Sequence, residues 1–151
     1  MARSEPSVRT TRMFRSLLPI VWPGHGLALA RFLESQAAVS QVNYPQLEKS
    51  PFCARARRLL PGGAGALLSF ELAGGKPALE SMLSRLQLVR LMPSLGSVAT
   101  TLSHPASTSH RGLDPVERAR AGISDGLVRC SVGLEHPDDL LEDFQRALTR
   151  S

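Results

Sequence analysis

The sequence predicts an α/β domain whose mostly antiparallel sheet is covered by helices. Short apolar segments with a period of two alternate with segments of helical spacing along most of the chain. Hydrophobic residues make up 42% and charged residues 21% of the chain, a balance that allows a real core. The length of 151 residues fits one ordinary domain.

The domain is expected to comprise residues 27–151. Residues 1–26 are expected to be an irregular lead-in, because arginine and serine follow one another without period and prolines and glycines interrupt the chain. From Leu27 an apolar face at helical spacing predicts a helix that closes near Ser35 to Ala38. The β-branched and aromatic segment 39–44 then predicts a short strand.

Helix and strand keep alternating in the middle of the chain. Residues 51–60 predict a helix with proline at its start, and residues 65–72 predict a strand whose apolar residues share one face. Residues 77–85 carry leucine and methionine at helical spacing and predict a further helix. An extended segment is predicted at 88–92.

A polar segment precedes the last three elements. Residues 94–112 are rich in Ser, Thr, Gly, His and Pro and predict a functional loop with one strand at 100–103. The final elements are a helix at 115–121, a strand at 127–132 and a helix at 137–148. The last helix starts with a proline and two aspartates, which favour a helix N-terminus.

The charge pattern argues against nucleic acid as a partner. The net charge of +5 comes mostly from scattered arginines, of which only Arg55, Arg57 and Arg58 form a tight cluster, and aromatic residues make up only 5% of the chain. No apolar run approaches the length of a membrane span, and the two cysteines lack metal-ligand spacing. We therefore expect no membrane partner, no metal site and a cytoplasmic protein with reduced thiols.

Arg129 is the side chain most able to carry chemistry. In the predicted strand 127–132 an apolar face consists of Val128, Cys130 and Val132, so Arg129 stands on the opposite face. A guanidinium in that position can hold a carboxylate through two parallel hydrogen bonds. The alternative is a solvated arginine on a sheet with one buried face, which is the commoner case in general.

Other candidate groups are weaker. The turn Pro93–Ser97 can offer a hydroxyl and free amides to an anion, although such turns are usually only turns. His104 and His110 lack an acid or nucleophile at catalytic spacing and are interpreted as loop structure. The chain has two lysines, Lys49 and Lys76, and neither has the apolar surroundings that Schiff-base chemistry needs.

Several linked motifs share their order and spacing with a known family. The motifs, in chain order, are Val42-Asn-Tyr-Pro45, Gly65-Ala-Leu-Leu-Ser-Phe-Glu-Leu72, Pro93-Ser-Leu-Gly96, His104-Pro-Ala106, Gly122-Ile-Ser-Asp-Gly-Leu-Val-Arg129 and Ser131-Val-Gly-Leu-Glu135. Together they resemble the C-terminal third of the Cys/Met-metabolism family of pyridoxal-phosphate (PLP) enzymes. This family includes cystathionine γ-synthase, cystathionine γ- and β-lyases, methionine γ-lyase and the homoserine sulfhydrylases.

The resemblance implies the fold and the site. The fold would be the C-terminal small domain of a fold-type I PLP-dependent transferase. Arg129 matches the arginine that binds the substrate α-carboxylate, Ser94 matches a serine beside substrate and cofactor, and Thr100 falls in the loop that lines the same pocket. The implied cofactor is pyridoxal 5'-phosphate, and the implied substrates are homoserine esters, cystathionine or methionine.

The departures from the family pattern qualify the expected activity. The family's cofactor lysine, its ring-stacking aromatic residue and its ring-nitrogen aspartate belong to an upstream large domain that these residues do not match. We therefore expect that this chain does not bind the cofactor covalently and is inactive without a large-domain partner. Assembly into a homo-oligomer is the alternative partner. Ala99 replaces a glutamate of many relatives, so the reaction stays open. The alternatives are a non-catalytic amino-acid-binding or assembly module and a degenerate gene remnant.

Overall fold

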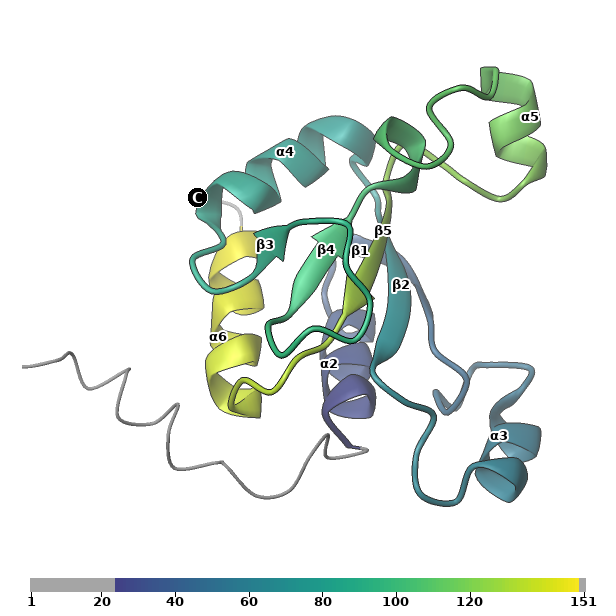
Figure 1. The fold of residues 1–151 in the computed structure, drawn as a ribbon, viewed down its shortest axis with the longest axis vertical. Helices are drawn as coiled ribbons and strands as arrows, with labels where there is room; N and C mark the ends of the chain where they lie inside the picture. Colours follow the sequence, from purple (N-terminus) through teal and green to yellow (C-terminus); the bar gives the residue numbers. More distant parts are fainter. Residues whose placement is uncertain (1–23, 150–151) are drawn as a thin grey trace, which may run out of the picture.

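The protein contains a five-stranded mixed sheet. The computed structural model describes residues 24–149, so residues 1–23 of the expected lead-in lie outside the described residues. Three of the four strand pairings are antiparallel, which confirms the predicted sheet, and only β4 and β3 run parallel. In spatial order the strands are β1 (Val39–Asn43), β2 (Leu67–Leu72), β5 (Leu127–Ser131), β4 (Thr101–Ser103) and β3 (Arg90–Leu91) (Figure 1).

Each predicted helix forms close to its expected bounds. They are α2 (Gly24–Glu34), α3 (Cys53–Leu59), α4 (Gly75–Arg85), α5 (Pro115–Arg120) and α6 (Pro137–Leu148), with an additional short 3-10 helix η1 (Pro105–Ser107) that the sequence did not predict. Helix α2 starts three residues earlier than expected. Gly26 was expected to break the helix, but it lies inside α2. A Cβ atom at this position would lie 2.5 Å from the carbonyl oxygen of Gly65, so the glycine allows the helix to pack closely against that backbone.

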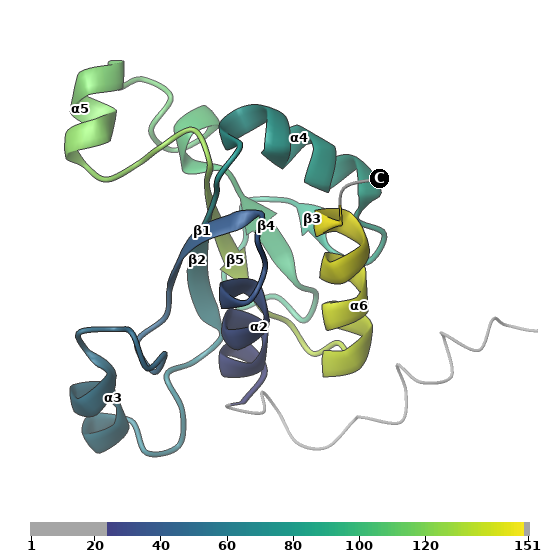
Figure 2. The same ribbon diagram turned by 180° about the vertical axis from the view of Figure 1, so that it is seen from behind.

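The core lies between one face of the sheet and helices α2, α4 and α6. Figure 2 shows α2 and α6 in front of the strands, and α2 contacts β1 and β2. Phe70 of β2 and Phe144 of α6 are fully buried and meet edge to face, with ring centroids 6.1 Å apart. The opposite face of the sheet carries mainly polar side chains and is called the open face below.

Helix α6 is tied to the chain before β3 by a buried carboxylate. Asp143 is 2% exposed and accepts hydrogen bonds from the backbone N–H groups of Gln87, Leu88 and Val89 at 2.9, 3.0 and 3.1 Å. Arg146 forms an ion pair with the same carboxylate. Because a buried charge is costly without such partners, these contacts determine how the segment after α4 enters β3.

The strand predicted at 100–103 forms as β4, but the expectation that this polar segment contributes no core element is wrong. Thr100, Thr101, Leu102, Ser103 and His104 are all buried, at 6% exposure or less. β4 is therefore an interior strand that pairs on both sides. The residues that flank β4 tolerate burial because their side chains find partners distant in sequence: Thr100 bonds the Glu135 carboxylate and His104 contacts the Asp125 carbonyl, which composition alone does not reveal.

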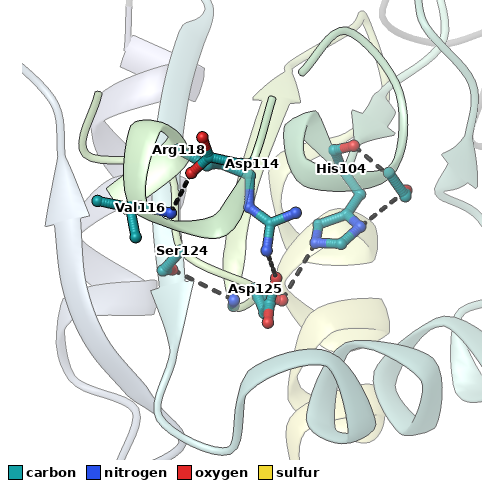
Figure 3. A network of polar contacts seen from close by, with 8 residues as sticks. His104, Asp114, Val116, Arg118, Ser124 and Asp125 are labelled. Atoms are coloured by element: carbon teal, nitrogen blue, oxygen red, sulfur yellow. Dashed lines mark hydrogen bonds and ion pairs between the residues drawn. The ribbon is translucent and has the colours of Figure 1, made fainter. Parts of the chain in front are cut away.

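A polar network anchors the segment that projects beyond β4 (Figure 3). The ring of His104 contacts the Ser107 hydroxyl at 2.8 Å and the backbone carbonyl of Asp125 at 3.1 Å. The Asp125 carboxylate forms an ion pair with Arg118 of α5 at 2.7 Å. The side chain of Asp114 caps α5 by accepting from two backbone N–H groups. The interpretation of His104 as loop structure is therefore confirmed.

No helix among residues 24–149 is long and apolar enough to cross a membrane.

Candidate functional site

Arg129 occupies the middle of the open face. It pairs in register with Ser69 of β2 on one side and with Ser103 of β4 on the other, so small side chains flank its guanidinium. Val128 and Cys130, its neighbours along β5, are fully buried on the core face. The predicted alternation of this strand is confirmed, and it puts the half-buried Arg129 on the face without helices.

The guanidinium of Arg129 lies against the turn that contains Ser94. One N–H of Arg129 donates a hydrogen bond to the backbone carbonyl of Ser94 at 3.2 Å. Among residues 24–149, no acidic side chain lies within ion-pair distance of Arg129. The remaining N–H groups can therefore hold a planar anion such as a carboxylate without displacing an internal partner.

A row of small polar side chains continues the site across the sheet. Ser69 is also paired in register with Asn43 of β1, whose side-chain amide donates to the Ser69 hydroxyl at 3.1 Å. Sequence reasoning missed Asn43, Ser69 and Ser103. The available signal was that Asn43 and Ser69 each stand at a polar position between apolar neighbours, but Ser103 precedes His104 and lacks this signal, and the matching of all three positions depends on strand register.

The expectation that the Pro93–Ser97 turn offers free amides to an anion fails at Gly96, whose N–H is already bonded. Gly96 has φ +72°, a left-handed conformation that favours glycine. Its N–H donates to the hydroxyl of Ser131 at 3.2 Å, which ties the turn to the end of β5. Ser94 is half-buried in this turn, and its carbonyl is the group that reaches Arg129.

Thr100 is a buried residue that follows the Pro93–Ser97 turn in the chain. Its side chain is fully buried, and its hydroxyl donates to the Glu135 carboxylate at 2.6 Å and accepts from the N–H of Gly133 at 2.8 Å. The hydrogen-bonding capacity of the hydroxyl is thus used inside the protein. The structure places Thr100 in the interior at the end of the segment that follows the Ser94 turn, so its side chain is not on the surface of the site.

The neighbouring residue, Thr101, has an unsatisfied hydroxyl. Its oxygen is buried and has no hydrogen-bond partner within the part of the chain that the structure describes. Thr101 pairs in register with Ser131, on the same face of the sheet as Arg129. An unpaired buried hydroxyl costs free energy of folding, so this position carries a local penalty.

The described residues do not supply a set that would hold the cofactor covalently. Lys49 pairs with Glu34 of α2 at 3.6 Å and Lys76 pairs with Glu80 of α4 at 3.7 Å, so both amines lie with the helices of the core face. Neither amine is buried, since the side chain of Lys49 is 80% exposed and that of Lys76 is 60% exposed. We therefore derive no chemical step through a cofactor.

The other titratable groups do not form a reactive cluster. Within residues 24–149 no group of His, Cys, Asp and Glu side chains could hold a metal ion. Cys53 and Cys130 are both free and buried. Burial, and secondarily the Glu135 carboxylate, raises the pKa of the Cys130 thiol far above its usual range, so this cysteine remains protonated and unreactive.

Comparison with known proteins shows the family of this chain. Residues 24–149 match the family model described as Cys/Met metabolism PLP-dependent enzyme. The O-acetyl-L-homoserine sulfhydrylase 1 of Thermus thermophilus is 44% identical over 122 residues, which cover 81% of this chain and 29% of that protein. The L-methionine gamma-lyase of Pseudomonas putida is 46% identical over 125 residues, or 82% of this chain and 31% of that protein.

A solved structure shows the same fold. The cystathionine gamma synthase of Xanthomonas oryzae pv. oryzae, in complex with aminoacrylate and cysteine, superposes with a TM-score of 0.76 at 41% sequence identity, over 83% of this chain and 32% of that chain. The chain thus spans about three tenths of the length of the relatives it matches. The expected fold, a domain of a fold-type I PLP-dependent enzyme, is confirmed. This chain belongs to the Cys/Met-metabolism family of PLP-dependent enzymes.

Proposed function

We propose that this domain supplies the site for the substrate α-carboxylate in a PLP-dependent enzyme of sulfur amino-acid metabolism. One observation carries the proposal. Arg129 stands between small side chains on the open face, without an acidic partner among the described residues, and its guanidinium contacts the Ser94 turn at 3.2 Å. Binding a carboxylate there would fix both the position and the orientation of an amino acid.

Ser94 and Thr100 have different roles in this proposal. Ser94 borders the anion site and contacts the ligand or its immediate surroundings, since it is half-buried and adjacent to the guanidinium. Thr100 acts from below by holding the loop in place, because its hydroxyl is already bound to Glu135 and Gly133. No group of the described chain is assigned to bond making or breaking.

The names of the relatives support the substrate class. They are a sulfhydrylase of O-acetyl-L-homoserine, a lyase of L-methionine and a synthase of cystathionine. These substrates share an α-amino acid carboxylate and differ in the side chain. A site built around one arginine fits the part that they share, so we propose homoserine esters, cystathionine or methionine as ligands.

The cofactor supplies the capacity to stabilise negative charge at the substrate carbon when it is bound. Neither lysine of this chain is placed to attach it, since both are engaged in ion pairs with the helices of the core face. We therefore propose that turnover requires a large-domain partner that holds PLP. This chain would contribute the binding and orientation of the substrate.

Titration of the full chain with matched ligands tests the carboxylate site. L-Methionine, cystathionine and O-acetyl-L-homoserine should bind saturably, whereas methioninamide, which lacks the carboxylate, should bind at least about tenfold more weakly. Hydrogen bonds to charged groups contribute about 1.5–3 kcal/mol, which corresponds to about 10–150-fold in affinity. Equal binding of methionine and methioninamide would contradict the proposal.

Variants locate the site. Arg129→Gln should lose the preference for methionine over methioninamide while the domain stays folded. Arg120→Gln is the matched control, because Arg120 is exposed on α5. If both variants bind methionine as the wild type does, the ligand does not dock on Arg129.

Turnover needs a separate measurement. The chain with PLP alone should give no sulfhydrylase or lyase activity. A chimera of the Thermus thermophilus sulfhydrylase that carries residues 24–149 in place of its matching segment should be active, and Arg129→Gln should reduce its activity. Thermal unfolding of the chimera checks that it folds. Turnover by the chain alone would refute the proposed need for a large-domain partner.

A further inference from the structure

The loop formed by residues 94–100, here called the Ser94 loop, runs alongside residues 129–135. The contacts recur at a nearly constant offset: residues 94 and 129, 96 and 131, and 100 and 135 are each 35 positions apart. A fourth contact joins the N–H of Leu134 to the carbonyl of Val98 at 2.8 Å. Two segments far apart in sequence are thus joined along their whole length.

Most of these contacts depend on particular side chains. Arg129 donates to the carbonyl of Ser94, the Ser131 hydroxyl accepts from Gly96, and the Glu135 carboxylate accepts from Thr100. Only the contact at Leu134 joins backbone to backbone. A β-ladder would form with almost any side chains, whereas the position of this loop depends on the residues at 129, 131 and 135.

The loop has little apolar packing of its own. Leu95 is 64% exposed and Val98 is 72% exposed, so neither of its large apolar side chains is buried in the domain. Hydrophobic contacts therefore contribute little to its position. The hydrogen bonds to residues 129–135 are what hold it against the sheet.

Glu135 makes the shortest of these contacts. One carboxylate oxygen accepts from the backbone N–H of Thr100 at 2.6 Å, and the other accepts from the Thr100 hydroxyl at 2.6 Å. The same hydroxyl accepts from the N–H of Gly133 at 2.8 Å. Both partners are half-buried or buried, so the charge-assisted bonds are shielded from competing water.

From this geometry we infer that Glu135 is a positioning residue for the carboxylate site. By holding Thr100 through both carboxylate oxygens, it sets the far end of the Ser94 loop, and the near end then presents the Ser94 carbonyl to Arg129. The guanidinium is thereby oriented without any contact between Glu135 and the ligand. The purpose of this arrangement rests on the proposed function, while the contact itself can be tested without a ligand.

Glutamine cannot replace Glu135 without loss. If its amide oxygen accepts from the Thr100 N–H, its NH2 group faces the Thr100 hydroxyl, which then has no acceptor for its own hydrogen. If the amide is turned around, its NH2 group opposes the Thr100 N–H. In the first orientation the Thr100 hydroxyl can accept from the NH2 group but its own hydrogen has no acceptor, and in the second the Thr100 N–H has no acceptor. Both orientations also lose the negative charge that strengthens these contacts, although the side chain keeps its size.

Amide hydrogen exchange of the full chain tests the inference directly. Glu135→Gln and Thr100→Val should each speed exchange at the amides of Gly96 and Thr100 by at least about tenfold. The core amides of Phe70 and Val128 should keep their wild-type exchange rates. Thr100→Ser, which retains the hydroxyl, should keep the wild-type rates in the loop as well.

Two further variants make the comparison specific. Glu142→Gln, which alters an exposed carboxylate on α6, should change neither the loop nor the core. The double variant Glu135→Gln/Thr100→Val should speed exchange by less than the product of the two single effects, because both changes disturb the hydrogen bond between the Thr100 hydroxyl and the Glu135 carboxylate. Unchanged exchange in the loop of Glu135→Gln, or equal acceleration in loop and core, would overturn the inference.

Ligand binding separates this inference from the proposed function. If the carboxylate site exists, Glu135→Gln should weaken methionine binding by about three- to tenfold while methioninamide is unaffected, since a displaced loop misorients Arg129. If the wild-type chain binds methionine and methioninamide equally, the proposed function fails. The exchange rates at Gly96 and Thr100 still decide whether Glu135 holds the loop.

Discussion

Gly133 offers a sharp test of how closely the Ser94 loop approaches the end of β5. A Cβ atom at this position would lie 2.4 Å from the Val98 carbonyl oxygen, 2.5 Å from the Ala99 carbonyl carbon and 2.6 Å from the Thr100 nitrogen. All three are backbone atoms, so no side chain can rotate away. In Gly133→Ala the loop must shift by at least about 0.6 Å to restore a separation of 3.0 Å.

The cost of Gly133→Ala follows from these contacts. Overpacking of this kind costs about 1–3 kcal/mol, and a weakened hydrogen bond from the Gly133 N–H to the Thr100 hydroxyl adds about 1 kcal/mol. The lower entropy of the unfolded alanine chain offsets about 0.4–1 kcal/mol. The net loss is about 1–3.6 kcal/mol, which lowers Tm by about 3–13 °C for a domain of this size.

Urea and thermal unfolding followed by circular dichroism measure this loss. Gly112→Ala is the matched control, because a Cβ at Gly112 meets no atom within 4 Å. The backbone amide shifts that change in Gly133→Ala should be concentrated at residues 94–100. If Gly133→Ala is as stable as Gly112→Ala and leaves those shifts in place, the close approach of the two backbones is not a feature of the folded protein.

Three further predictions concern single side chains. Thr101→Val should raise the free energy of unfolding by about 1 kcal/mol, because it removes an unpaired buried hydroxyl, and a loss of stability in urea unfolding would show that the hydroxyl has a partner. Asp143→Asn should lower the free energy of unfolding by about 2–3 kcal/mol, because an asparagine accepts more weakly from the backbone N–H groups of residues 87–89. An unchanged free energy of unfolding would contradict the role of these hydrogen bonds in stability. Cys130 should make the domain less stable at alkaline pH, because burial raises the pKa of its thiol in the folded state. Below about pH 8 the thiol is protonated in both states, and above about pH 9 it ionises only in the unfolded state. The free energy of unfolding should therefore fall by up to about 1.4 kcal/mol per pH unit above about pH 9. Cys130→Ala should lack this component, and equal slopes in the two proteins would refute the assignment.

Local patterns in the sequence predicted the face on which Arg129 stands, whereas its choice as the candidate site residue rested on the resemblance to a known family. The period of two in residues 127–132 reflects the alternation of side chains along an extended backbone, which is a local property. It correctly put Arg129 on the face opposite Val128 and Cys130. The predicted helices likewise formed where apolar spacing and N-terminal signals agreed, as in α6.

The surroundings of the site depend on contacts that a local pattern does not encode. The polar segment Thr100–His104 looks exposed by composition, but partners such as Glu135 and Asp125 allow it to be buried. The row formed by Asn43, Ser69, Arg129 and Ser103 requires the order and register of four strands. Gly26 is similar, since its role becomes visible only when Gly65 lies against it.

The central claim is that the guanidinium of Arg129 binds the carboxylate of an amino acid. Side-chain NMR of the full chain with 15N-labelled arginine observes that group directly, with Arg129→Gln to assign its resonances. We predict that the Arg129 guanidinium signals shift saturably with L-methionine and hardly at all with methioninamide. Signals that stay in place as methionine is added, or that shift equally with both ligands, would contradict the account.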